Sequence, residues 1–307
     1  MSDTIQAIGQ WLDSNKEWVF SGAGISVLLV VGAALKFLFS RHPKPLLPSQ
    51  IPWQSQITAP RPRLDIIRER GVIRLGFFQY SPLICDDGNN CPSGIYGAIA
   101  NEVFPKLGVA IEWHPVNVGH AVSSLIDGTI DCMVCIFQTA ERAKHADFVS
   151  LLHTVTVTGV VRAANREIRS QADLHNPNLR LAVCRGEIGH ELATKVLQVP
   201  STRLHVLDAP DVANVCALVQ SGIADVAIAD GISIKRYLST NTQSPKLRQI
   251  FLQHPLAMCF NGFMVARNEP DLGKWIDDQF RSHIWSPEIV QLETETLDNY
   301  HGILRKA

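Results

Sequence analysis

The sequence predicts an α/β protein with two similar lobes joined by two strand-like crossings and preceded by a membrane-spanning segment. Three observations lead to this prediction. Strand patterns alternate with amphipathic helix patterns from Leu64 onward. The order of strands and helices in the first half of this region recurs in the second half. An apolar run, Trp18–Phe39, stands near the N-terminus and is long enough to cross a bilayer.

The composition is that of an ordinary globular chain. The 307 residues are 46% hydrophobic and 19% charged, enough for one two-lobed domain. The net charge of −1 and the lack of a basic stripe with interleaved aromatic residues argue against a nucleic-acid partner. We therefore expect partners other than nucleic acid.

The cysteines are odd in number, seven, so they cannot all pair within one chain. Five lie in apolar runs, and we expect them to be buried reduced thiols: Cys132, Cys135, Cys184, Cys216 and Cys259. Cys85 and Cys91 flank a turn-rich stretch. A bridge between them in an oxidising compartment is an alternative that the sequence leaves open.

The N-terminal part is predicted to be a leader, residues 1–17, followed by a transmembrane helix, residues 18–40. The leader carries Asp3, Asp13 and Glu17 in place of a basic segment, and no A-x-A cleavage site follows. We therefore expect an uncleaved anchor that contacts the lipid bilayer through residues 18–40. A buried core helix is the alternative.

The charges around the apolar run predict its orientation. Lys16 stands alone before it, whereas Lys36, Arg41 and Lys44 lie at or after its end, which favours a cytoplasmic location for the rest of the chain. Residues 41–63 contain six prolines. That density prevents helix formation and predicts an extended linker to the folded domain, residues 64–307.

The first half of the folded domain alternates strands and helices. Three strands are predicted at Val72–Phe78, 109–116 and 129–137. Two helices are predicted at Ile95–Leu107, ended by Gly108, and at 120–127. The last strand is apolar throughout, which is typical of a strand covered on both faces.

The second half repeats this pattern. Strands are predicted at Asn178–Arg185, 202–208 and 223–230, with helices at 190–198 and 211–221. Ser124–Ile136 and Ala217–Ala229 each contain the end of a helix, a glycine turn, an aspartate and a continuous apolar run. Two copies of one β-α-β-α-β unit predict two α/β lobes with mainly parallel sheets.

Two long β-branched or apolar segments, Leu151–Asn165 and Met258–Asn268, are predicted to cross between the lobes as a double hinge. Two helices follow, at 269–284 and near Ser286–Leu297. Lobe 1 then comprises residues 64–157 and 263–307, and lobe 2 comprises residues 163–258. Ligands of such sheets sit outside the carboxyl ends of the strands, so we expect a cleft between the lobes that closes on its ligand.

The stretch Cys135–Phe148 begins at the carboxyl end of a predicted strand, at the edge of the cleft. Thr139 is a suitable N-cap for a following helix, and Arg142 would then lie one turn in. A guanidinium there can hold a carboxylate with two hydrogen bonds. The alternative is an ion pair of Arg142 with Glu141 or Asp147 on a solvated face.

Five segments in order resemble the family 3 periplasmic (extracellular) solute-binding proteins, which bind polar amino acids. They are residues 67–84, 93–109, 125–152, 181–193 and 217–230, and the resemblance covers about Leu64–Leu297. It implies a two-lobed periplasmic-binding-protein-like (type II) fold with a double hinge.

The resemblance also implies roles for four residues. Tyr80 resembles the aromatic residue that packs on the ligand side chain. Thr139 and Arg142 resemble the hydroxyl and the guanidinium that take the ligand α-carboxylate, and Asp230 resembles the carboxylate that takes the α-amino group. The alternatives are ordinary packing for Tyr80 and an N-cap for Asp230.

The chain departs from the family pattern at Gly186-Glu187. The family has a hydroxyl residue at the position of Glu187, beside the ligand carboxylate, whereas Glu187 places a negative charge there. Three interpretations stay open. Glu187 pairs with Arg185 or Arg142, or the ligand is cationic or multiply polar, or the cleft is degenerate and empty.

We expect a membrane-anchored protein that captures a small polar, amino-acid-like solute for a membrane transporter or a signalling partner. A sensory or regulatory domain facing the cytoplasm is the alternative, and a dehydratase-like enzyme is a further one. The sequence has no nucleophile elbow, H-E-x-x-H motif, P-loop or paired metal-ligand spacing, so we predict no catalytic residue, cofactor or metal.

We expect a single-pass protein of the bacterial inner membrane. The charge bias favours a cytoplasmic domain, and the family resemblance favours a periplasmic one.

Overall fold

The computed structural model describes residues 61–88, 91–208, 211–242, 245–267 and 269–307. The predicted leader, the predicted anchor and most of the predicted linker lie outside these ranges. Within them, no helix combines the length and the apolar character needed to cross a bilayer.

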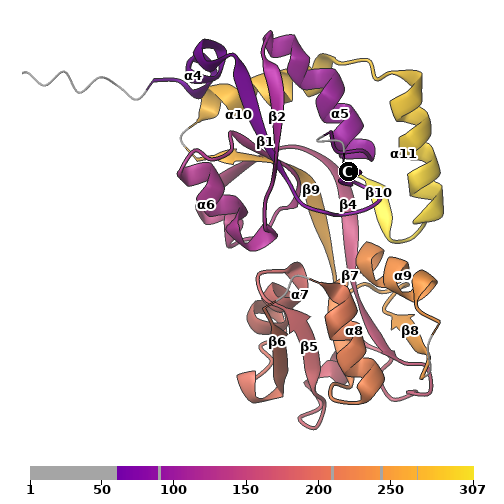
Figure 1. The fold of residues 1–307 in the computed structure, drawn as a ribbon. Coiled ribbons are helices and arrows are strands. Elements are labelled where there is room, and N and C mark those ends of the chain that lie inside the picture. Colours follow the sequence, from indigo (N-terminus) through magenta and orange to yellow (C-terminus); the bar gives the residue numbers. More distant parts are fainter. Residues whose placement is uncertain (1–60, 89–90, 209–210, 243–244, 268) are drawn as a thin grey trace, which may run out of the picture. The chain divides into compact units, whose positions relative to one another are not determined.

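Lobe 1 is built on three parallel strands (Figure 1). These are β1 (Val72–Phe77), β2 (Ala110–Pro115) and β3 (Cys132–Phe137). Its helices are α4 (Arg63–Arg70), α5 (Ile95–Val103), α6 (Ala121–Ile126), α10 (Pro270–Ser282) and α11 (Pro287–Asn299). Neighbouring side chains of β3 point to opposite faces of the sheet. Met133 packs with residues of α6 and Val134 with residues of α5, so helices cover both faces. This explains why β3 is apolar throughout.

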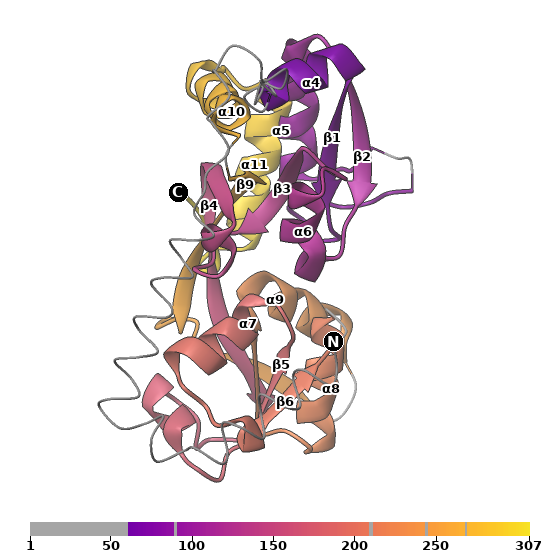
Figure 2. The ribbon, with the colours of Figure 1, turned by 90° about the vertical axis from the view of Figure 1, so that its left-hand side faces the viewer.

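Lobe 2 has a similar design (Figure 2). Its strands are β5 (Leu181–Cys184), β6 (Leu204–Leu207), β7 (Val226–Asp230) and β8 (Leu247–Ile250). Its helices are α7 (Ile188–Glu191), continued by a π-helical segment Leu192–Val196, α8 (Val212–Ser221) and α9 (Gly231–Thr240). β5 pairs in parallel with β6 and β7. The structure confirms the predicted α/β class.

Two long strands connect the lobes. β4 (Ala146–Arg162) and β9 (Ala257–Ala266) pair antiparallel and run from one lobe into the other (Figure 1). Their register shifts between Val149 and His153, and such irregularities bend a strand pair. Because both strands pair at each end, the hydrogen-bonded path β2-β1-β3-β9-β4-β7-β5-β6 is continuous. Each lobe was expected to have a sheet of its own. That expectation is wrong, because hydrogen bonds to β4 and β9 join the strands of both lobes into one sheet.

The sequence did not predict three elements. These are α4, β8, which pairs with β4, and β10 (Leu304–Lys306), which also pairs with β4. The helix expected after Thr139 is only a short 3₁₀ turn, Arg142–Lys144. Further 3₁₀ turns lie at Phe104–Leu107, Val118–His120, Gln171–His175 and Ser201–Arg203.

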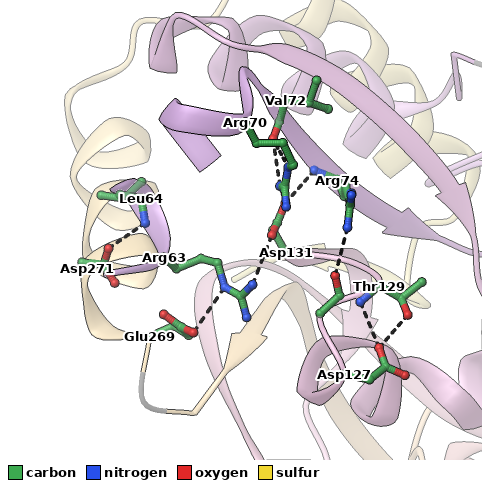
Figure 3. Close-up of polar contacts among 11 residues, drawn as sticks. Arg63, Leu64, Arg70, Val72, Arg74, Asp127, Thr129, Asp131, Glu269 and Asp271 are labelled. Carbon is green, nitrogen blue, oxygen red and sulfur yellow. Dashed lines mark hydrogen bonds and ion pairs between the residues drawn. The ribbon is translucent and has the colours of Figure 1, made fainter. Parts of the chain in front are cut away.

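A buried carboxylate fixes α4 to the sheet (Figure 3). The side chain of Asp131 is fully buried and accepts hydrogen bonds from the guanidinium of Arg70 and, at 2.8 Å, from the backbone N–H of Arg74. Nη1 of Arg63 lies 3.7 Å from the same carboxylate, and its Nε lies 3.2 Å from Oε1 of Glu269. Buried charges need such partners, so these contacts hold α4 against the rest of lobe 1.

All seven cysteines are free thiols in the structure. The five predicted to be buried are buried, whereas Cys85 is half-buried and Cys91 is exposed. The Nδ2 group of Asn101 donates to Sγ of Cys91 at 3.2 Å. The Cys85–Cys91 bridge is therefore absent from this structure.

Candidate functional site

A cavity of 650 Å³ opens between the two lobes. Its wall contains the last residue of β1, β3, β5 and β7, which are Phe77, Phe137, Cys184 and Asp230. The carboxyl ends of these strands therefore meet at one place, where open α/β sheets bind ligands. The volume lies within the range of small-molecule sites, roughly 300–1,000 Å³.

Tyr80 and Asp230 meet across this cavity. Oη of Tyr80, in lobe 1, donates to Oδ1 of Asp230, in lobe 2, over 2.8 Å. The same oxygen accepts the backbone N–H of Ser233 at 2.9 Å, so Asp230 is also the N-cap of α9. Burial raises the pKa of Asp230, and the two hydrogen bonds oppose that rise. Asp230 therefore caps α9 and also lines the cleft.

Aromatic rings hold Tyr80 in place. Its ring stacks on Phe78, with centroids 5.5 Å apart, and meets Phe137 edge-on at 5.7 Å. Burial raises the pKa of the Tyr80 hydroxyl, and the negative charge of Asp230 raises it further. The hydroxyl is therefore a neutral hydrogen-bond donor, and the rings form an apolar wall.

Arg142 lies behind the cavity wall and bonds to main-chain oxygens of both lobes. Nη1 donates to the carbonyl oxygen of Phe137 at 3.0 Å, and Nη2 donates to that of Gly186 at 3.2 Å. The backbone N–H of Arg142 donates to Oγ1 of Thr139 at 3.2 Å, so Thr139 does cap a turn. Burial lowers the pKa of Arg142, and the nearby carboxylates of Glu187 and Glu191 counteract this.

The alternative of a solvated ion pair for Arg142 is wrong. Arg142 is only 8% exposed. Glu141 pairs instead with Lys144 at 2.6 Å, and Asp147 pairs with Arg267 at 3.6 Å. The guanidinium is thus a buried group between the lobes.

Glu187 lines the cavity at the start of α7. Burial raises its pKa to about 7; the guanidinium of Arg142 opposes this rise, and the charge of Asp230 adds to it. Arg185 is not its partner, because Arg185 pairs with Asp208 on the surface. The electrostatic partner of Glu187 is therefore Arg142.

The structure brings the six predicted site residues together in two groups. Tyr80, Glu187 and Asp230 line the cavity. Thr139, Arg142 and Gly186 are not part of the cavity wall and are joined to one another by hydrogen bonds. Whether any of them contacts a ligand stays a prediction.

Sequence reasoning missed other lining residues, among them Asn117, Asp211 and Arg236. Asn117 follows β2, and Asp211 caps α8, so both stand just beyond carboxyl ends of strands. That position was the signal that could have identified them. Among the residues that the structure describes, no group of three or more His, Cys, Asp or Glu is placed to hold a metal ion.

Solved structures with the same architecture include several binding domains. An ancestral amino acid-binding protein, a precursor of cyclohexadienyl dehydratase, is 23% identical and aligns with a TM-score of 0.63 over 76% of this chain and 99% of its own. The solute receptor for L-cysteine of Neisseria gonorrhoeae is 21% identical, with a TM-score of 0.63 over 78% and 95%. A histidine kinase sensor domain is 19% identical, with a TM-score of 0.62 over 76% and 96%. These likenesses show a type II periplasmic-binding-protein-like fold.

The membrane-bound lytic murein transglycosylase F of Vibrio cholerae is 27% identical over 188 residues, which are 57% of this chain and 35% of the relative. This chain thus matches about a third of the length of that relative. The profile of the bacterial extracellular solute-binding proteins, family 3, matches residues 73–297. The chain therefore belongs to the bacterial extracellular solute-binding proteins of family 3.

Proposed function

We propose that this protein is a membrane-anchored binding protein that captures a small polar, amino-acid-like solute between its lobes without transforming it. The observation that carries the proposal is the cavity whose wall comes from both lobes. A ligand there would touch both lobes at once, and lobe closure about β4 and β9 would enclose it. Binding would then favour the closed arrangement.

Asp230 and Tyr80 are the residues that we assign to ligand recognition. The carboxylate of Asp230 is the buried anionic group at the cavity, and a ligand ammonium group would take the place of the Tyr80 hydroxyl as its partner. The rings of Phe78 and Tyr80 would pack on the apolar part of the ligand.

A binding role without catalysis agrees with the chemistry of the cavity wall. The thiol that lines it, Cys184, has a pKa raised to about 12 by burial, so it is protonated and a poor nucleophile near neutral pH. Tyr80 is likewise held neutral. The similar binding protein described as a precursor of cyclohexadienyl dehydratase and the similar transglycosylase keep an enzymatic role as the alternative.

A ligand screen tests this function. The full-length chain, in detergent micelles, is heated with single proteinogenic amino acids and with small amines, and the unfolding temperature is recorded. A ligand at 100 times its Kd adds about 2.7 kcal/mol to the stability. We expect at least one such ligand to stabilise the wild type and not the Asp230→Asn variant. Stabilisation by none of them would refute the binding role.

Delivery to a transporter and signalling through the anchor are the two downstream roles that we propose. The likeness to a histidine kinase sensor domain favours signalling. A C-terminal alkaline phosphatase fusion and a green fluorescent protein fusion separate the two. Active phosphatase indicates an extracytoplasmic domain suited to capture for transport, whereas fluorescence indicates a cytoplasmic sensor.

A further inference from the structure

We propose that the ligand of this cleft is a small cationic amine without a carboxylate group, with its ammonium on Asp230. This inference rests on the proposed binding function and names the ligand class. It departs from the α-amino acids that the family resemblance implies. Three features of the cleft carry it: the bonds of Arg142, the position of Glu187 and the charges around the cavity.

Arg142 is already bonded to the protein. Its two terminal nitrogens donate to the carbonyl oxygens of Phe137 and Gly186, and the residue does not line the cavity. These bonds use two of the five N–H donors of the guanidinium, and the other three are not presented to the cavity, because Arg142 is not part of its wall. The bond to Gly186 also joins the lobes, and a carboxylate that replaced the Gly186 oxygen would break this contact.

The backbone approach at Gly186 makes such a displacement difficult. A Cβ atom built on Gly186 would lie 3.7 Å from Cα of Gly119, so the main chains of the two lobes pass close together here. Moving the chain at Gly186 to admit a carboxylate would therefore disturb this contact between the lobes.

Glu187 supplies a carboxylate of the protein itself at this end of the cavity. It lines the cavity one residue after Gly186, and its negative charge favours the charged form of the Arg142 guanidinium. At a pH above its pKa of about 7, Glu187 thus offsets the positive charge that would attract a ligand carboxylate. A ligand carboxylate would also face the like charges of Glu187 and Asp230.

The charged side chains around the cavity are mostly acidic, which also favours a cationic ligand. Four acidic side chains line it, Asp86, Glu187, Asp211 and Asp230, against one basic side chain, Arg236. Asp230 is buried, whereas Asp86 and Asp211 are exposed. A molecule with a positive group at each end would place one end on Asp230 and the other near the exposed acids, with its chain against Phe78 and Tyr80. A diamine or a guanidino-amine has this form.

Two matched ligand pairs test the inference on the full-length protein in detergent micelles. Cadaverine is lysine without its carboxylate, and agmatine is arginine without its carboxylate. Isothermal titration and thermal unfolding are measured with all four compounds at pH 8. We expect at least one of the two amines to bind at least about tenfold more tightly than its amino acid, which corresponds to about 1.4 kcal/mol.

The Glu187→Gln variant tests the cause of the selectivity. Removal of this charge should weaken amine binding and reduce the preference for the amine over the amino acid by at least about tenfold. Glu167→Gln, an exposed residue of lobe 2 outside the cavity wall, is the control and should leave both affinities unchanged. Unfolding of each variant without ligand checks that it is folded.

Each outcome decides the inference. If ligands bind but neither amine binds more tightly than its amino acid, the inference is wrong, but the binding function stands. If none of the four compounds binds, the inference is also wrong, and the binding function falls with it only if the wider screen of amino acids and amines fails too. An unaltered preference in Glu187→Gln would remove Glu187 as its cause.

Discussion

The hydroxyl of Tyr80 donates to the carboxylate of Asp230 across the cleft, over 2.8 Å. Both side chains are buried, and Asp230 also caps α9 through the backbone N–H of Ser233. One carboxylate thus holds the start of a helix and a contact between the lobes. The Tyr80 hydroxyl occupies the position that we assign to a ligand ammonium group.

Removal of this contact should shift the protein toward a more open arrangement. We expect Tyr80→Phe to lower the free energy of unfolding by about 1–3 kcal/mol, because a buried carboxylate loses a hydrogen bond. The radius of gyration of the ligand-free protein should increase, which small-angle X-ray scattering measures. Tyr237→Phe is the control, since the Tyr237 hydroxyl contacts Gln220 in the same lobe. An unchanged radius in Tyr80→Phe would show that this contact does not hold the lobes together.

Glu187 should make stability depend on pH near neutrality. Its pKa in the folded protein is raised to about 7, against an ordinary value of about 4.3. Its protonated form therefore stabilises the folded state, and this contribution is complete below about pH 4.3 and lost as the pH rises through 7. We expect Glu187→Gln and wild type to unfold at similar temperatures at about pH 5, and the variant to be more stable at about pH 8.

The control for this prediction is again Glu167→Gln, whose side chain is exposed. Its difference from wild type should not change with pH. Thermal unfolding across the same pH range measures both variants. A constant difference between Glu187→Gln and wild type would contradict the raised pKa of Glu187.

Glu293 should stabilise the folded protein at neutral pH and lose this effect in acid. His153 and Lys306 bond to its carboxylate at 3.0 and 2.7 Å and lower its pKa to about 2. This stabilisation is present above about pH 4.3 and is lost as the pH falls through 2. We expect Glu293→Gln to cost about 2–3 kcal/mol at pH 7 and progressively less below about pH 4.

Glu295→Gln is a matched control on the same helix. Glu295 is exposed and accepts a hydrogen bond from Gln291. Denaturant unfolding at several pH values should show a change of no more than about 0.5 kcal/mol for it. An equal loss in both variants would mean that the contacts of Glu293 with His153 and Lys306 add no stability.

Much of the fold follows from apolar periodicity. The runs that became β3 and β7 are buried along their whole length, and such burial leaves a clear pattern in the sequence. α4 left no such pattern, because Ile67 is its one buried residue among those described. The polar contacts that fix α4 to the rest of the domain are to Asp131, Glu269 and Asp271, far away in the sequence.

The candidate site was predictable where a residue follows a strand. Asp230 ends β7, and Glu187 comes shortly after β5, so both could be placed at the cleft. The bond of Arg142 to Gly186 could not be predicted. It joins residues 44 positions apart and depends on the relative position of the two lobes, which local patterns do not encode.

The substitution Gly189→Ala should test whether close packing of α7 on β7 fixes the position of Glu187 at the cleft. Gly189 packs against β7, and a Cβ atom there would lie 2.1 Å from the carbonyl oxygen of Ile228, a main-chain atom that cannot rotate away. Gly189→Ala should therefore push α7 from the sheet and cost about 1–3 kcal/mol, as overpacking does. Because Glu187 precedes α7, the displacement should also expose its carboxylate and lower its pKa.

The readout that separates this effect from general destabilisation is the pH dependence. In the Gly189→Ala background, the further change Glu187→Gln should no longer raise stability at about pH 8. Gly273→Ala, in the helix α10, is the control, since its nearest neighbour is a side-chain methyl of Val149 at 3.2 Å, which can shift. In that background the pH-dependent effect of Glu187→Gln should persist. Its persistence in Gly189→Ala as well would show that close packing of α7 on β7 does not set the environment of Glu187.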